Sequence, residues 1–191
     1  MKEDNIKKIL EAGIKLLSRK NFYQLGLQEL LKTVNIPKGS FYYYFESKED
    51  FAIQVVDYYT NMSAQKMKAA LLDQSKSPRA RLQGFFDERV NDYSKDNFEV
   101  GCLLGDLANE MAGQSKGLRE KFESKFLSWQ SIIAQCISEG QSAGEFNNEQ
   151  SAEELADYIL SSWEGALIRM KAAGSKRPYT LFVNYTMNQI L

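Results

Sequence analysis

The sequence predicts an all-α protein of about nine helices. Apolar residues recur along most of the chain at the three- and four-residue spacing of amphipathic helices, and no long segment shows the alternation of a strand. Ser-Pro and Ser-x-x-Asp/Glu motifs, which begin helices, precede several of these segments. With 191 residues, 43% of them apolar, the chain can bury a core. We expect a small N-terminal domain of three helices, residues 1–47, and a larger helical domain, residues 48–191.

The N-terminal domain is organised around two short helices joined by a tight turn. Residues 27–34 carry leucine and valine at the spacing that lines one helical face, and the pattern stops at a turn before Pro37. A second short helix fits Lys38–Tyr44, because a proline is tolerated at its start. Phe41 and Phe45 lie four residues apart and are predicted to pack back on the first helix.

The outward face of the second short helix carries groups suited to nucleic acid. It consists of Lys38, Gly39, Ser40, Tyr42 and Tyr43. An ammonium, a hydroxyl and two phenols can contact phosphates or base edges, and the glycine allows close backbone approach. Two helices that present such a face form a helix-turn-helix. The alternative is that the two tyrosines are ordinary helix surface.

A longer helix is predicted to begin directly after this motif, at the start of the second domain. Ser47 and Asp50 have the spacing of a capping box, in which the hydroxyl caps the helix and the acid favours its first turn. Lys48 lies at the same helix start and is well placed to meet a phosphate.

The run KGSFYYYFESKEDF, with Ile6–Leu17 before it, closely resembles the DNA-binding domain of TetR-type transcriptional repressors. The resemblance covers about the first fifty residues. It implies a homodimeric regulator, a repressor, that places two recognition helices in successive major grooves of a palindromic double-stranded operator. The implied DNA contacts are Gln28, Lys38, Gly39, Ser40, Tyr42, Tyr43 and Lys48. The chain departs from the family pattern at Leu25-Gly26, where a hydroxyl residue is usual, and at Pro37, so Gly26 is expected to act as a weaker cap.

Seven helices outside the short pair are predicted from periodicity and capping signals. Six of them have expected ranges of 3–19, 47–72, 100–111, 118–140, 151–171 and 178–191. The seventh begins at Pro78 and has core positions up to Tyr93. The second of them would join the DNA-reading domain to the rest of the chain.

The family resemblance implies two tasks for the helical domain: dimerisation through its last two helices and binding of a small-molecule effector. The helix Ser151–Lys171 is the best candidate for the dimer interface, because small residues that allow close approach accompany large apolar ones. The predicted interface residues are Leu155, Ile159, Trp163 and Ala166. The same stripe could instead be core within one chain.

Aromatic and sulfur-containing side chains of the helical domain suit a flat or hydrophobic effector. The predicted pocket residues are Tyr58, Met62, Phe86, Tyr93, Cys102, Phe122, Trp129, Ile133 and Trp163. Side chains at this spacing also form plain core. Arg89 and Arg169 could face an anionic effector, or be paired or solvated surface charges.

Cys102 has two interpretations. At the expected start of a helix, the helix dipole favours a thiolate, as an electrophile or oxidant sensor would require. A free cysteine is more commonly buried and inert, which is the interpretation we give to Cys136.

Other functions find little support in the sequence. The chain has no histidine, no glycine-rich phosphate loop and no metal-ligand spacing, so we expect no enzyme activity, no cofactor and no metal site. Residues 1–50 carry nine Lys/Arg and seven Asp/Glu, whereas the whole chain has a formal charge of -1, so the asymmetry supports nucleic-acid binding only weakly. No apolar run approaches a membrane span, and we expect a cytoplasmic protein without a membrane partner. The main alternative is a DNA-binding protein whose helical domain binds no ligand and serves dimerisation or recruitment of a protein partner.

Overall fold

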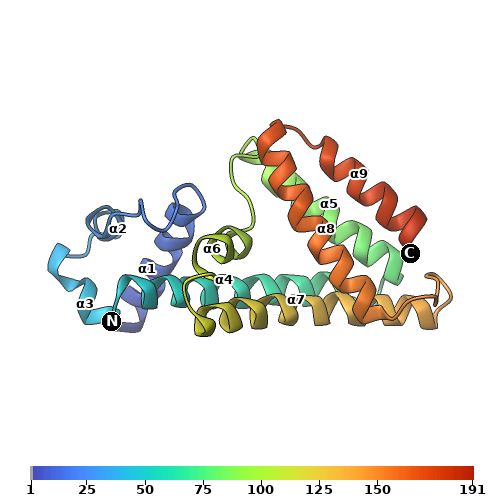
Figure 1. Cartoon of the computed structure of the whole chain (residues 1–191), viewed down its shortest axis with the longest axis horizontal. Helices are drawn as coiled ribbons and strands as arrows, with labels where there is room; N and C mark the ends of the chain where they lie inside the picture. Colours follow the sequence, from blue (N-terminus) through green and yellow to red (C-terminus); the bar gives the residue numbers. More distant parts are fainter. Residues whose placement is uncertain (1) are drawn as a thin grey trace. The chain divides into compact units, whose positions relative to one another are not determined.

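The computed structural model describes residues 2–191, and across them the chain contains nine α-helices and no strand (Figure 1). The helices are α1 (Lys2–Leu17), α2 (Leu27–Thr33), α3 (Phe41–Tyr44), α4 (Lys48–Leu71), α5 (Pro78–Lys95), α6 (Leu103–Met111), α7 (Lys116–Ser142), α8 (Ala152–Ala173) and α9 (Arg177–Tyr185). A 3-10 turn, Lys38–Ser40, precedes α3, and a π-helical turn, Thr186–Ile190, follows α9. The predicted all-α class is confirmed.

Two compact units divide the chain. The N-terminal unit comprises the chain up to Met62 together with Cys102–Phe122, and the C-terminal unit comprises Ser63–Gly101 and Glu123–Leu191. The predicted boundary between residues 47 and 48 falls at the start of α4, whereas packing assigns the first part of α4, all of α6 and the start of α7 to the N-terminal unit. Periodicity identifies the helices but not which of them pack together.

The capping residues read from the sequence act as expected. The Ser77 hydroxyl accepts a hydrogen bond from the Ala80 N–H and Pro78 opens α5, so this helix begins where predicted. Ser151 and Glu154 form a complete capping box at the start of α8. Gly174 ends α8 with a φ of 56°, a left-handed conformation that favours glycine.

Aromatic rings form the core of the N-terminal unit. The ring centroids of Phe41 and Phe45 lie 5.3 Å apart, and Phe51 of α4 lies 5.7 Å and 5.1 Å from them, respectively. All three side chains are at most 2% exposed, which confirms the core assignment of Phe41 and Phe45. Gly13 lets α1 approach α4 closely, because an added Cβ would lie 2.6 Å from Phe51 Cζ.

A second aromatic cluster lies within the C-terminal unit. Trp163 of α8 packs against Phe86 of α5 and Phe182 of α9, with ring centroids 5.1 Å and 5.6 Å away. Tyr179 adds its ring 6.2 Å from Trp163 and donates its phenol proton to the Asp87 carboxylate. Burial and this carboxylate raise the pKa of the Tyr179 phenol. The cluster fixes α5, α8 and α9 against one another.

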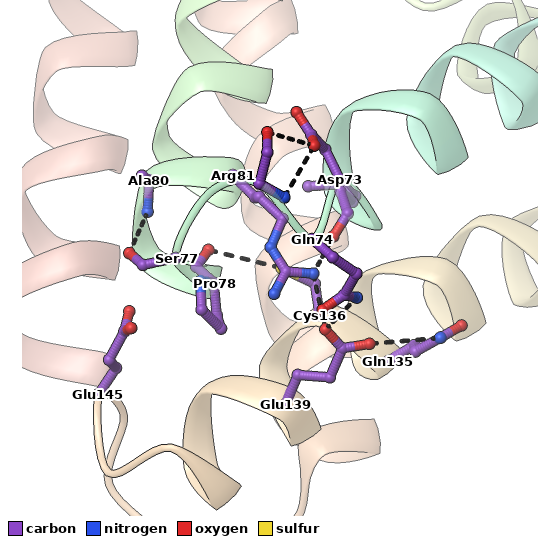
Figure 2. A network of polar contacts seen from close by, with 12 residues as sticks. Asp73, Gln74, Ser77, Pro78, Ala80, Arg81, Gln135, Cys136, Glu139 and Glu145 are labelled. Carbon is purple, nitrogen blue, oxygen red and sulfur yellow. Dashed lines mark hydrogen bonds and ion pairs between the residues drawn. The ribbon is translucent and has the colours of Figure 1, made fainter.

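A polar network joins α4, α5 and α7 of the same unit (Figure 2). The Arg81 guanidinium of α5 donates to the Glu139 carboxylate of α7 and to the Leu71 carbonyl oxygen at the end of α4. The Gln74 side-chain amide donates to Glu139 as well, at 3.0 Å. Arg81 thereby satisfies one of the terminal carbonyl groups that the end of a helix leaves without a partner.

No helix within residues 2–191 combines the length and the hydropathy that crossing a lipid bilayer requires.

Candidate nucleic-acid interface

The helix-turn-helix consists of α2, a turn and α3. Gly26 precedes α2 without a side-chain cap, and the Leu30 N–H completes the first turn by donating to its carbonyl oxygen at 3.0 Å. At the other end of α2, Asn35 adopts a φ of 54°, and the Ile36 N–H returns to Leu31 O. Asparagine tolerates this left-handed conformation better than most residues, so the sequence specifies a sharp turn there.

The sequence predicted one regular helix over Lys38–Tyr44, but the structure has a 3-10 turn followed by a short α-helix. The first of these residues form the 3-10 turn, in which the Ser40 N–H donates to Pro37 O at 3.0 Å, and the α-helix begins at Phe41. Pro37 is extended, with φ -56° and ψ 139°, so it lies outside the helix. Such 3-10 turns are common at helix ends.

The predicted DNA-reading face is open to solvent. Tyr42 and Tyr43 are 70% and 64% exposed, whereas the neighbouring Phe41 is 1% exposed. Lys38, Gly39 and Gln28 are also exposed, and Ser40 is half-buried. A Cβ at Gly39 would meet nothing within 4 Å, so the surface beside it is free for close approach.

The start of α1 lies beside this face, a contact that sequence periodicity does not predict. The ammonium of Lys2 lies 4.8 Å from the centroid of the Tyr43 ring, and Asn5 Nδ2 donates to the Tyr44 phenol oxygen at 3.0 Å. A cation over an aromatic face is attracted by the ring. The lysine at the start of the chain was the available signal, but nothing in the sequence placed it beside Tyr43.

Lys48 is already held by protein groups. The Ser47 hydroxyl accepts from the Asp50 N–H and caps α4, while the Asp50 carboxylate accepts from the Glu46 N–H. The Lys48 ammonium donates to Tyr23 O at 3.3 Å and lies 4.9 Å from the centroid of the Phe22 ring. Burial lowers the pKa of Lys48. A lysine ammonium has three N–H donors, so the contact with Tyr23 leaves capacity for a phosphate.

The nine predicted effector residues are divided between the two units. Tyr58, Met62, Cys102 and Phe122 belong to the N-terminal unit, and Phe86, Tyr93, Trp129, Ile133 and Trp163 belong to the C-terminal unit. The Tyr58 phenol donates to Glu11 at 3.0 Å, and Met62 is 38% exposed. Phe86 and Tyr93 both lie in ring contact with Trp163; Phe86 is a core residue, whereas Tyr93 is half-buried.

Neither cysteine is in a disulfide. Cys102 is the N-cap residue of α6, as the sequence predicted, but its side chain makes no capping hydrogen bond and is 5% exposed. Cys136 is fully buried, as predicted, and burial raises the pKa of its thiol to about 11. The guanidinium of Arg89 pairs with Glu88 and Asp92, which matches the alternative of a paired charge.

The predicted dimer residues are already buried within one chain. Leu155, Ile159, Trp163 and Ala166 are at most 7% exposed. The solvent-exposed side of α8 carries Tyr158 and Ile168, which are 52% and 66% exposed.

Helices α8 and α9 lie side by side (Figure 1). They border an open groove of about 540 Å³. Its lining includes Tyr158, Gly165, Arg169, Leu181 and Tyr185. The available sequence signal was the second helical stripe of α8, formed by Tyr158, Ser162, Gly165 and Arg169 at spacings of three and four residues. The stripe is mixed in polarity, so the more apolar stripe drew the prediction.

No cluster of acidic or cysteine side chains able to hold a metal ion occurs among residues 2–191.

The arrangement of α2 and α3, with its exposed face of lysine, serine and tyrosine, defines a helix-turn-helix DNA-binding protein.

Comparison with known proteins defines the class further. The family model described as "Bacterial regulatory proteins, tetR family" matches residues 9–55, and the one described as "Tetracyclin repressor-like, C-terminal domain" matches residues 78–186. The transcriptional regulator AcuR of Cereibacter sphaeroides is 34% identical over 163 residues, which is 85% of this chain and 74% of that protein. The transcriptional repressor DhaR of Mycobacterium sp. strain GP1 is 29% identical over 183 residues, 96% of this chain and 90% of that protein.

A solved structure agrees with this assignment. The crystal structure of reduced NemR from Escherichia coli has a TM-score of 0.88 at 25% identity and covers 97% of this chain and 96% of its own. The chain therefore belongs to the TetR family, as its first fifty residues indicated. It is a DNA-binding transcriptional regulator and not an enzyme.

Proposed function

We propose that the chain is a repressor that binds a palindromic operator as a homodimer. The observation that carries this proposal is one solvent-facing surface, on which Lys38, Gly39, Tyr42 and Tyr43 are exposed and Ser40 is half-buried, built on a core that buries Phe41. Side chains on one solvent-facing surface of a helix-turn-helix can read base edges, while Lys48 and Gln28 contact phosphates at neighbouring helix starts. The name of DhaR, a transcriptional repressor, supports repression over activation.

Dimerisation would use the outer face of α8 and α9. Leu181 and Tyr185 of α9 line the groove and are 50% and 63% exposed, and Tyr158 of α8, which also lines it, is 52% exposed. Large apolar side chains gathered on one surface mark an interaction site. A second copy with the same surface gives a two-fold symmetric interface, and two-fold symmetry matches a palindromic operator.

The effector in this proposal is a small hydrophobic or electrophilic molecule that binds in the helical part of the chain and releases the operator. For a hydrophobic effector the candidates are Trp129 and Ile133 of α7, buried apolar residues of the C-terminal unit. For an electrophile the candidate is the thiol of Cys102, the N-cap residue of α6 in the N-terminal unit. A conformational change can pass along α4, because this one helix starts at Lys48 beside the DNA-reading face and extends into the C-terminal unit. A coupling of about 1–3 kcal/mol would weaken operator binding roughly 5- to 150-fold.

A repressor without a ligand is the second candidate, in which the helical part serves dimerisation or recruits a protein partner. Phe86, Tyr93 and Trp163 favour it, because these predicted ligand residues pack against one another. A thermal-shift screen with hydrophobic small molecules separates the two. Reproducible stabilisation by one compound class supports the effector, and none across a broad screen supports the second candidate.

Operator binding is tested by titrating the purified protein with DNA from immediately upstream of its own gene at two salt concentrations. We expect saturable, sequence-selective and salt-sensitive binding. Lys48→Ala should weaken binding to all sequences and reduce the salt slope by about one unit, whereas Tyr42→Phe should alter sequence preference. Equal binding to unrelated DNA would contradict the proposal.

The electrophilic effector is tested in the same assay with a mild electrophile. Loss of operator binding on treatment, prevented in Cys102→Ser, supports Cys102 as the sensor. Operator binding indifferent to the reagent removes Cys102 from this role and leaves a hydrophobic ligand as the effector.

A further inference from the structure

Helix α6 contacts the loop between α1 and α2, residues 18–26, within the N-terminal unit. The Glu110 carboxylate, at the end of α6, accepts a hydrogen bond from the backbone N–H of Phe22 at 2.7 Å. Directly after α6, Gln114 Nε2 donates to the Tyr23 phenol oxygen at 2.6 Å and to Glu110 O at 3.1 Å. Two side chains from one helix end thus hold two consecutive loop residues.

The contact with Phe22 is the stronger of the two. A carboxylate that accepts from a backbone N–H forms a charge-assisted hydrogen bond, which is stronger than a neutral one. The Phe22 residue is 8% exposed, so water has limited access to its N–H if Glu110 is removed. The loop therefore depends on α6 for a backbone hydrogen bond that its own residues do not supply.

Lys48 contacts the same two loop residues from α4. Its ammonium donates to Tyr23 O and lies over the Phe22 ring, so both the backbone and the side chains of this dipeptide fix its position. The loop also connects to α2, because the Lys20 ammonium lies 2.6 Å from the Glu29 carboxylate. If Phe22 and Tyr23 shifted, the carbonyl oxygen and the ring that hold the Lys48 ammonium would move with them. The loop would also pull on α2 through the Lys20–Glu29 ion pair.

We propose that Glu110 and Gln114 are positioning residues for operator binding, which hold Phe22 and Tyr23 where they support Lys48. This inference rests on the proposed function, because it assigns Lys48 to a phosphate contact. The end of α6 then controls the phosphate-binding geometry without touching DNA.

Hydrogen–deuterium exchange tests the contact without DNA. Glu110→Ala should accelerate exchange of the Phe22 amide roughly tenfold or more, and Glu110→Gln, which keeps an acceptor, should give an intermediate rate. The matched control is Asn109→Ala, the adjacent exposed residue of α6, which should leave this amide unchanged. An unchanged rate in Glu110→Ala would overturn the proposal.

Operator titrations with the same variants test the positioning role. Glu110→Ala and Gln114→Ala should each weaken binding about 3- to 30-fold, with Glu110→Gln closer to the wild type. The decisive measurement is a double-mutant cycle with Lys48→Ala. If Glu110 acts through Lys48, the Glu110→Ala/Lys48→Ala protein should bind little worse than Lys48→Ala alone.

Fully additive losses in this cycle, or unchanged operator affinity despite faster Phe22 exchange, would overturn the positioning role. Because Gln114 is exposed, Gln114→Ala provides a test if Glu110→Ala fails to fold. If the wild-type protein shows no selective DNA binding, the proposed function is overturned instead. The exchange experiment uses no DNA, so it still reports whether Glu110 holds the Phe22 amide.

Discussion

Arg81 Nη1 lies 2.6 Å from Glu139 Oε2, and the Arg81 side chain is only 3% exposed. The same nitrogen donates to Leu71 O at 3.0 Å, so one guanidinium joins α5, α7 and the end of α4. The Glu139 side chain is 29% exposed, so the pair is buried on the arginine side only.

We therefore expect Arg81→Ala to lower the free energy of unfolding by about 1–3 kcal/mol, because it leaves the Leu71 carbonyl oxygen without its donor and breaks the ion pair with Glu139. Denaturant unfolding monitored by circular dichroism measures this change. Arg119→Ala, at an exposed arginine, is the control and should shift stability by less than about 0.5 kcal/mol. Equal stability of the two variants would show that the Arg81 network contributes nothing.

Glu139 should make part of this stability depend on pH. Hydrogen bonds from Gln74 and Arg81 lower the pKa of its carboxyl below the ordinary value of 4.5. A lowered native pKa contributes stability above pH 4.5, and this contribution is lost as the pH falls below that value towards the native pKa. The stability difference between the wild type and Glu139→Gln should thus be largest near neutral pH and shrink below pH 4.5. A constant difference across this range would contradict the assignment.

Cys136 should resist alkylation in the folded protein. Burial raises the pKa of its thiol to about 11, so little thiolate exists at pH 8, and the thiolate is the nucleophile. In Cys102→Ser, where Cys136 is the remaining cysteine, iodoacetamide should modify the thiol after denaturation but not before. Mass spectrometry gives the extent of modification. Cys136→Ser, measured in parallel, reports Cys102 alone.

Gly13→Ala should destabilise the N-terminal unit. A Cβ at this position would lie 2.6 Å from Phe51 Cζ and 2.8 Å from Val55 Cγ2, and both side chains are fully buried. Overpacking of this kind costs about 1–3 kcal/mol, which thermal unfolding can measure. Gly84→Ala on α5 is the opposite control: its Cβ meets nothing within 4 Å, and alanine is the better helix former, so we expect a gain of about 0.5–1 kcal/mol.

Two equally exposed leucines provide a matched test of the proposed dimer surface. Leu181 lines the groove beside α8, whereas Leu127 lies on α7, and both are 50% exposed. Leu181→Glu should convert the dimer to a monomer in light scattering, because a carboxylate would be buried at the interface. Leu127→Glu should leave the dimer intact. Dissociation by Leu127→Glu, but not by Leu181→Glu, would place the interface elsewhere.

Local chemistry made most of the helices predictable from the sequence. Ser77-Pro78 and the Ser151–Glu154 capping box set helix starts, because these side chains satisfy the first N–H groups directly. The core positions of Phe41 and Phe45 were predictable for a similar reason, since their spacing defines one face.

Tertiary partners were harder to predict. Leu155 and Ile159 form an apolar stripe, but periodicity does not say whether the neighbour belongs to the same chain, and here it does. The 3-10 start of the recognition element depends on the backbone around Pro37, and the contact between Glu110 and Phe22 joins residues 88 positions apart. The first is a detail of backbone conformation that side-chain periodicity does not report, and the second is set by tertiary packing.

The contacts of Lys48 bear on the entropy of operator binding. A free lysine side chain samples many rotamers, and immobilising it on binding costs roughly 0.5–1.5 kcal/mol. In this protein the Tyr23 carbonyl and the Phe22 ring restrict the ammonium before any DNA is present. Part of that cost therefore falls on folding, and in the proposed complex with the operator a phosphate would meet a cation whose position is already set.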